Sequence, residues 1–170
     1  FAHLDCRRWV IDRNLNEMID FLQVEMAGNT VVVLTSGDPL FFGIGALLSR
    51  RLGAGTIRIF PNISAVAAAF ARIGEPWQDV SVVSLHGRSH TGQLMRHLAG
   101  GDTVAVYTDP VRNPGWLADL LIENAFGHVG MTVVEQLGTA GEKLTHTTPV
   151  KAQGAQFSDL NLVILKPDPV

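Results

Sequence analysis

Short runs of aliphatic and β-branched residues alternate with stretches of helical periodicity along this chain. TVVVL at 30–34 is apolar throughout, and a strand of that kind suits a parallel sheet that is buried on both faces. A helical pattern follows it, then the run TIRIF at 56–60, and then a helix rich in small residues. Strand, helix, strand and helix in this order predict a right-handed parallel unit. The first part of the chain therefore predicts an α/β fold.

The second half of the chain combines this alternation with strands that follow one another directly. The predicted strands are 80–86, 103–109, 131–138, 142–150 and 160–166, and the predicted helices lie around 91–99 and 114–125. No helix separates the last three strands, which is typical of an antiparallel meander or hairpin. This half therefore predicts a mixed sheet.

The segment GEPWQD at 74–79 is the best candidate for a linker. A chain of 170 residues is long enough for two small lobes that share a cleft. We predict an N-terminal α/β lobe with a parallel sheet at 1–77 and a C-terminal mixed α/β lobe at 78–170. The opening FAHLDCRRWV contains neither an initiator Met nor a strand. We therefore expect residues before Phe1 and an N-terminal lobe that lacks its first strands.

Composition and charge argue against several classes of protein. The chain is 46% hydrophobic and 17% charged, which favours a large buried core over disorder. A net charge of −3 gives no attraction to nucleic acid or to an anionic membrane, and no apolar run approaches the roughly 20 residues of a membrane helix. The single cysteine, Cys6, fits a reducing cytoplasm. The histidines lack the spacing of metal ligands, so no metal site is expected.

The corner TSGDPLFFGIG at 35–45 follows the first apolar run and precedes a helix. In open α/β sheets, ligands bind beyond the carboxyl ends of the strands, and Gly37 would let the backbone approach a ligand closely. Asp38 can cap free backbone N–H groups, or accept hydrogen bonds from the hydroxyl or amine groups of a ligand. The corner has neither the Gly-Lys-Ser/Thr of a phosphate-binding loop nor the glycine spacing of a dinucleotide site. Phosphate binding is therefore not supported.

A second corner of the same kind follows the run at 56–60. Pro61, Asn62 and Ser64 lie where this strand is expected to give way to a helix. Ser64 can cap that helix or offer its hydroxyl to a ligand. Both corners would open on the same edge of the sheet, which favours one shared binding site.

Four segments together resemble the tetrapyrrole (corrin/porphyrin) methylases. The resemblance extends over essentially the whole chain, and its segments are VVLTSGDPLFFGIGALL, FPNISAVAAAFARIGEPWQDVSVVSLHGR, VVEQLGTAGEKL and NLVIL. It is closest to the branch of the cobalamin pathway that methylates carbon 5 of the ring. One departure lies at the second corner, where the family usually has Pro-Gly-Val-Ser-Ser and this chain has Pro61-Asn62-Ile63-Ser64-Ala65.

The resemblance implies a methyltransferase of two α/β lobes, usually a homodimer, with S-adenosylmethionine folded in the cleft between the lobes. The cofactor-binding residues that it implies are Ser36, Gly37, Asp38, Phe41, Ser64, Ala65, Thr108, Leu137 and Gly138. The substrate would be a precorrin, a small-molecule tetrapyrrole, and the product of the cofactor would be S-adenosylhomocysteine. The family also provides for a decarboxylating methyltransferase domain after residue 170.

Cationic and neutral donors would bind the many carboxylates of such a substrate. His86 and Arg88 follow a predicted strand on a Gly turn, and Arg112 lies at a helix start. We predict Arg88 and Arg112 as substrate-binding residues and His86 as the base that removes a proton after methylation. The alternative for His86 and Arg88 is a surface turn with solvated side chains.

Two other interpretations stay open at this point. A non-catalytic, flavodoxin-like nucleotide-binding module would share the parallel-sheet pattern and the capping corners. A sibling methylase that acts on another tetrapyrrole, such as uroporphyrinogen, or on diphthine would share the family motifs. Binding of S-adenosylhomocysteine in preference to mononucleotides would separate the nucleotide module from either enzyme.

Overall fold

The structure is a computed structural model that describes residues 5–11, 14–86 and 90–167. It consists of two compact units, which divide between Asn62 and Ile63. The helix that follows this division, α3 (Ala65–Ile73), therefore lies in the second unit. The predicted linker begins only after that helix, at residue 74, so the helix that we placed in the first lobe packs with the second.

The first unit is built around two helices and a small apolar core. Its elements are α1 (Leu15–Glu25), α2 (Gly45–Leu52) and a short 3₁₀ helix, η1 (Ala54–Thr56). The buried core residues come from both α-helices and are Met18, Ile19, Leu22 and Leu48. Asn14 begins α1, because its side chain accepts the backbone N–H of Glu17 at 3.2 Å.

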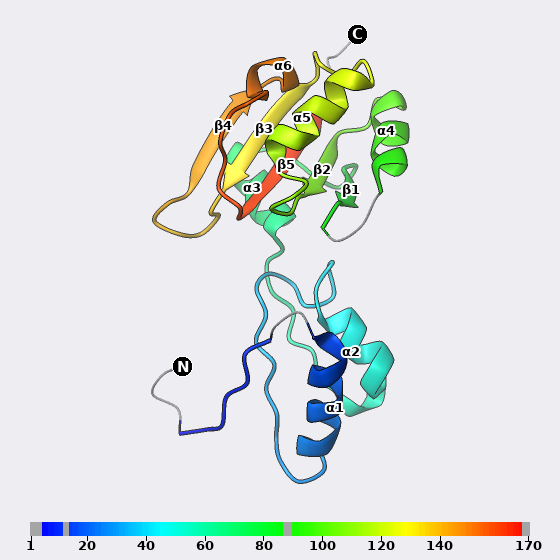
Figure 1. Cartoon of the computed structure of the whole chain (residues 1–170), viewed down its shortest axis with the longest axis vertical. Helices are drawn as coiled ribbons and strands as arrows, with labels where there is room; N and C mark the ends of the chain where they lie inside the picture. Colours follow the sequence, from blue (N-terminus) through cyan, green and yellow to red (C-terminus); the bar gives the residue numbers. More distant parts are fainter. Residues whose placement is uncertain (1–4, 12–13, 87–89, 168–170) are drawn as a thin grey trace. The chain divides into compact units, whose positions relative to one another are not determined.

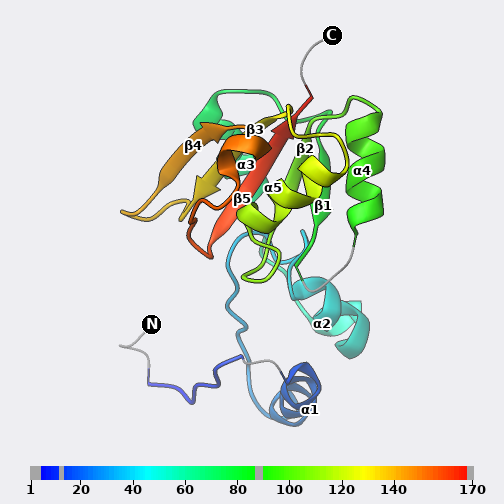
Figure 2. The ribbon, with the colours of Figure 1, turned by 45° about the horizontal axis from the view of Figure 1, so that its top comes forward.

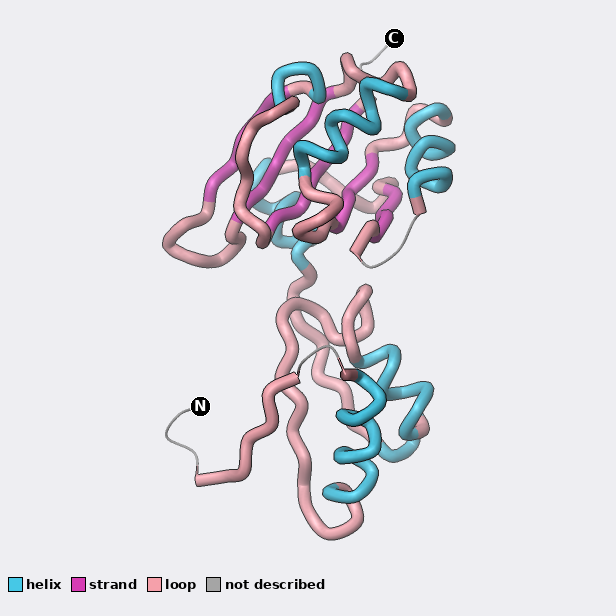
Figure 3. Tube along the Cα trace, viewed as in Figure 1, coloured by secondary structure: helices cyan, strands magenta, loops and turns pink. Residues whose placement is uncertain are grey.

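The two strands predicted at 30–34 and 56–60 are not formed. Figure 3 shows 30–34 and the residues after η1 as loop, and within the described residues of this unit no strand pairs with them. Side-chain burial still alternates as in a strand: Val31 and Val33 pack on the helical core, whereas Val32 is 74% exposed. A strand needs a partner for its ladder of hydrogen bonds, which the local pattern cannot supply. The predicted parallel sheet of the N-terminal lobe is therefore corrected to two extended segments beside two helices.

The second unit contains the mixed sheet that the sequence predicts. Its strands are β1 (Ser81–Ser84), β2 (Val104–Tyr107), β3 (Gly130–Glu135), β4 (Lys143–Thr147) and β5 (Asn161–Lys166). Their order across the sheet is β1-β2-β5-β3-β4. β1 and β2 are parallel, β3 and β4 form an antiparallel hairpin, and β5 lies antiparallel between β2 and β3. The last strand of the chain thus closes the gap between the parallel pair and the hairpin.

Helices cover both faces of this sheet (Figures 1 and 2). One face carries α4 (Thr91–Ala99), α5 (Pro114–Glu123) and the short α6 (Pro149–Ala152), whose residues share one buried cluster with β1, β2, β3 and β5. The other face carries α3, with Val66, Ala69 and Phe70 buried. In the part of the chain that the structure describes, no helix has the length and the apolar character needed to cross a membrane.

A polar cluster holds the end of α4 against the sheet. Asp102 Oδ2 lies 2.7 Å from His97 Nδ1 and accepts a hydrogen bond from Ser81 Oγ at 3.1 Å. These two hydrogen bonds, the one with His97 first, hold the pKa of Asp102 below its ordinary value of 3.8. Ser81 and Asp102 both meet the same ring nitrogen of His97, so the cluster lacks the geometry of a Ser-His-Asp triad, which uses both nitrogens. Its role is to join α4 to β1.

Asp102→Asn is expected to destabilise the protein at neutral pH, because the variant loses the charge that His97 and Ser81 favour. The folded-state pKa lies below the unfolded one, so the stabilisation is complete above about pH 4 and is lost as the pH falls through the folded-state value. Urea midpoints from circular dichroism should therefore be lower for the variant above about pH 4 and converge with the unaltered protein below it. A difference that grows toward acid pH would contradict this role, and Asp79→Asn, an exposed site, is the control.

Candidate functional site

The first corner is a tight turn that Asp38 holds from within. Its Oδ1 accepts the backbone N–H groups of Leu40 at 2.8 Å and of Phe41 at 3.2 Å. Gly37 has a φ of 64°, in the left-handed region that favours glycine. Ser36 is exposed and Phe41 is half-buried. Four predicted cofactor residues thus lie together on one turn of the first unit.

Asp38 also joins the two corners. Its second oxygen, Oδ2, accepts the backbone N–H of Asn62 at 3.3 Å, across 24 positions of sequence. The sequence leaves open whether Asp38 caps a turn or meets a ligand, and in the structure both of its oxygens bind backbone N–H groups. Asp38 therefore shapes both corners, and its contact with a cofactor stays a prediction.

The second corner continues into α3 in the second unit. Ser64 caps that helix, since its Oγ accepts the backbone N–H of Ala67 at 3.1 Å, and its own hydroxyl proton takes no part in that bond. The hydroxyl of Tyr107, at the end of β2, accepts backbone N–H groups of Val66 and Ala65. Burial raises the pKa of Tyr107, and these two hydrogen bonds oppose the rise. The start of α3 thus lies against the carboxyl end of β2.

Polar residues occupy the ends of β1 and β2. Thr108 is buried, and its Oγ1 donates to Asn161 Oδ1 at 2.6 Å. His86 is exposed, with its Nδ1 at 3.4 Å from the Thr108 carbonyl. Arg112 Nη1 lies 3.1 Å from Asp109 Oδ2 and donates to a backbone carbonyl at the end of β1 at 3.3 Å. The structure therefore brings His86, Thr108 and Arg112 together at one edge of the sheet.

The turn after β3 carries the last two predicted cofactor residues, Leu137 and Gly138. Gln136 and Gly138 have φ angles of 49° and 76°, and a Cβ at Gly138 would meet nothing within 4 Å. Gly138 N–H donates to Glu142 Oε2 at 2.6 Å, so this hydrogen bond stabilises the turn itself. Gln136 N–H donates to the carbonyl before β5, at Leu160, at 2.8 Å. This turn thus lies at the same edge of the sheet as Thr108, because β5 begins there.

Within the second unit, the structure groups the predicted residues at the start of α3 and at the ends of β1, β2 and β3. The first unit carries four other predicted residues, Ser36, Gly37, Asp38 and Phe41. That they form one site with the residues of the second unit stays a prediction. Arg88 lies outside the described residues.

Several buried polar residues at this edge were missed by the sequence analysis. Asp109 Oδ1 accepts the backbone N–H groups of Val111 and Arg112 at 2.9 and 2.6 Å, and Glu135 Oε1 accepts that of Ser158 at 2.7 Å. Glu135 Oε2 is buried without a hydrogen bond, and Lys143 Nζ lies 3.9 Å from it. The Asp-Pro pair at 109–110, which repeats Asp38-Pro39 of the first corner, was a signal for Asp109. The partners of Glu135 come from distant parts of the chain and carry no local signal.

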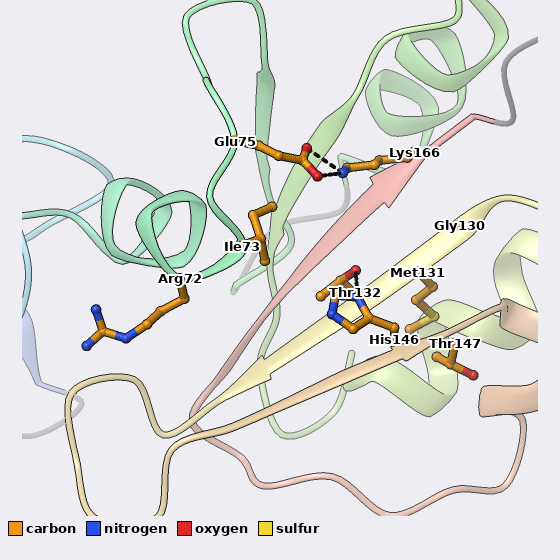
Figure 4. A pocket seen from close by; sticks show the side chains of 9 residues that line it. All are labelled: Arg72, Ile73, Glu75, Gly130, Met131, Thr132, His146, Thr147 and Lys166. Carbon is orange, nitrogen blue, oxygen red and sulfur yellow. Dashed lines mark hydrogen bonds and ion pairs between the residues drawn. The ribbon is translucent and has the colours of Figure 1, made fainter.

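A hollow of about 380 Å³ lies at the other end of β3 and β5, away from these turns. Figure 4 shows Lys166 bonded to Glu75 and His146 beside Thr132, whereas Arg72 extends away from both pairs. Within the hollow Lys166 thus bonds Glu75, whereas Arg72 bonds Glu142 outside its lining. No group of three or more potential metal ligands occurs among the described residues.

The edge of the sheet offers hydroxyl and backbone groups, open space beside Gly138, and one exposed imidazole. Such an arrangement can hold a polar ligand with hydroxyl and amine groups, and His86 can exchange a proton with it. It suits chemistry that depends on positioning, because the ligand then supplies its own leaving group.

Comparison with known proteins identifies clear relatives. Residues 7–152 match the family model of the Tetrapyrrole (Corrin/Porphyrin) Methylases. A precorrin-6Y C(5,15)-methyltransferase (decarboxylating) of Sinorhizobium sp is 44% identical over 123 residues, which are 72% of this chain and 29% of that protein. A cobalt-precorrin-7 C(5)-methyltransferase of Salmonella typhimurium is 37% identical over 135 residues, which are 79% of this chain and 65% of that protein. The chain therefore spans less than two thirds of either relative.

The fold also matches a solved structure. Uroporphyrin-III C-methyl transferase from Thermus thermophilus, complexed with S-adenyl homocysteine, matches with a TM-score of 0.73 at 20% identity. The match covers 97% of this chain and 78% of that one. At this identity the match concerns the fold alone.

Asp38→Asn is expected to separate the two functions of the carboxylate. The amide oxygen can still accept from Leu40 and Phe41, whereas the amide NH₂ would face the N–H of Asn62 and lose that bond. Amide hydrogen exchange should then accelerate at Asn62 and change little at Leu40 and Phe41. Asp38→Ala should accelerate all three, and an unchanged rate at Asn62 in both variants would contradict the link between the corners.

Proposed function

Because the chain belongs to the tetrapyrrole (corrin/porphyrin) methylases, we propose that it transfers a methyl group from S-adenosylmethionine to carbon 5 of a precorrin in cobalamin biosynthesis. The observation that carries this proposal is that two relatives, at 44% and 37% identity, are both named as methyltransferases of carbon 5. The word decarboxylating belongs to a relative of which the chain covers 29%, so decarboxylation is not part of this proposal.

The polar groups at the strand ends fit the proposed cofactor. S-adenosylmethionine supplies, when bound, a methyl group on a sulfonium that is its own leaving group. Ser64 and Thr108 offer hydroxyl groups, Gly37 and Gly138 adopt left-handed backbone angles, and the space beside Gly138 is open within 4 Å. We assign cofactor binding to these residues with Ala65 and Leu137 beside them. Their work is to orient the ligand and to exclude water.

The charged residues near the end of β1 are assigned to the substrate. Arg88 and Arg112 would bind the peripheral carboxylates of the tetrapyrrole, Arg112 from the position that Asp109 holds. His86 would take the proton that the ring loses after methylation, since its imidazole is exposed at the strand end. Catalysis by a protein of this kind relies on placing the ring carbon in line with the methyl group.

The cell compartment, the oligomeric state and a further domain of the protein are also proposals. A reducing cytoplasm agrees with the single cysteine, which is exposed. A homodimer and a decarboxylating domain in the same protein stay predictions from the family resemblance.

Full-length protein incubated with a precorrin and S-adenosylmethionine is expected to add one methyl group, detected by mass spectrometry.

Gly37→Ala should weaken S-adenosylhomocysteine binding about tenfold, because a non-glycine residue at a φ of 64° costs roughly 1–2 kcal/mol. Gly28→Ala is the matched control in the same unit, where a Cβ meets nothing within 4 Å. Binding is measured by calorimetry. The proposal would be wrong if the unaltered protein bound mononucleotides and did not bind S-adenosylhomocysteine.

His86→Asn is expected to lower kcat about 100-fold and to leave the affinity for S-adenosylhomocysteine unchanged, since general-base catalysis contributes at least that factor. His128→Asn, at another exposed histidine, is the control. An unchanged kcat in His86→Asn would assign His86 to a solvated surface turn.

A further inference from the structure

The turn at 136–142 holds one peptide group in a fixed orientation. Gly138 N–H donates to Glu142 Oε2 at 2.6 Å. This N–H shares a trans peptide with the carbonyl of Leu137, and the two groups of a trans peptide point in opposite directions. Binding the N–H to Glu142 therefore turns the Leu137 carbonyl to the other side of the turn.

Glu142 is itself held by a residue that is distant in the sequence. Arg72 Nε donates to Glu142 Oε1 at 2.5 Å, and Arg72 Nη2 lies 3.4 Å from Glu142 Oε2. The guanidinium is the first cause that lowers the pKa of Glu142, and the N–H of Gly138 is the second. One carboxylate thus binds both the turn and the guanidinium.

Arg72 lies in the last turn of α3, and Ser64 and Ala65 lie at the start of the same helix. A helix of nine residues is a stiff rod of about 13 Å. The pair of Arg72 and Glu142 therefore connects the turn after β3 to the element that carries the second corner.

We propose that Arg72 and Glu142 are positioning residues for the cofactor, which act by orienting the Leu137–Gly138 peptide relative to the start of α3. The inference rests on the proposed function, because Leu137, Gly138, Ser64 and Ala65 are assigned to cofactor binding there. Neither Arg72 nor Glu142 is required to touch the ligand.

This role differs from that of an ordinary surface ion pair. Exposed pairs contribute roughly 0–1 kcal/mol to stability, and the Arg72 side chain is 49% exposed. A second exposed pair, Lys166 with Glu75, lies beside Gly130, at the opposite end of β3 from the 136–142 turn (Figure 4). The two pairs thus provide a matched comparison between an ion pair that holds the turn and one that does not.

The test uses full-length protein with the variants Glu142→Ala, Arg72→Ala, Arg72→Lys and, as the control, Glu75→Gln. Glu142→Ala should raise the Kd of S-adenosylhomocysteine and the KM of S-adenosylmethionine about tenfold, with kcat and the KM of the tetrapyrrole changed less than about twofold. Arg72→Ala should have a smaller effect, and Arg72→Lys should restore part of it. Glu75→Gln should change none of these values.

Two further measurements separate positioning from general destabilisation. Amide exchange at Gly138 should accelerate in Glu142→Ala and stay unchanged in Glu75→Gln. The variant Arg72→Ala/Glu142→Ala should bind no more weakly than Glu142→Ala alone, since Arg72 acts through Glu142.

The outcomes distinguish this inference from the function on which it rests. An unaltered protein that fails to bind S-adenosylhomocysteine overturns both. An unaltered protein that binds, together with a Glu142→Ala variant of unchanged Kd and KM, overturns only the positioning role. Equal losses of affinity in Glu142→Ala and Glu75→Gln would also overturn it, because the effect would then be one of general stability.

Discussion

Backbone N–H groups at the turns after strands and before helices need acceptors, and carboxylates meet this need throughout the chain. A hydrogen bond to a charged group contributes roughly 1.5–3 kcal/mol, so each carboxylate stabilises the turn that it serves. The carboxylates that accept such N–H groups are Asp38, Asp109, Glu135 and Glu142. They lie at the first corner, after β2, at the last residue of β3 and in the turn after it, where cofactor binding is proposed.

Because these carboxylates bind backbone groups, most of the polar contacts to a ligand are expected from other groups at the site. Both oxygens of Asp38 bind backbone groups, and Asp109 holds its own turn and Arg112. In our assignment the cofactor would therefore meet backbone groups and the hydroxyl groups of Ser64 and Thr108, and the substrate would meet His86, Arg88 and Arg112. Such groups suit a cofactor that carries its own leaving group, because the protein then has to orient two ligands and need not activate a nucleophile.

The sequence predicts the parts of this arrangement that depend on neighbouring residues. It places β5 and the β3–β4 hairpin, and it gives the cap of α3 as one of two roles for Ser64, because periodicity and capping are local signals. It fails for the strands at 30–34 and 56–60, since strand formation depends on a partner strand that the local pattern does not contain. The family resemblance, and not the residues alone, predicted Thr108, Leu137 and Gly138.

The contacts that sequence patterns cannot predict are those that join distant segments. Asp38 reaches Asn62 across 24 positions, and Arg72 reaches Glu142 across 70. Each contact joins a turn of the proposed site to a residue that binds no ligand in our assignment. Precision at such a site is set by the elements that support its turns, and a change of a few tenths of an ångström there alters the orientation of a whole peptide group. Residues that never touch the cofactor can therefore set its affinity as strongly as those that do.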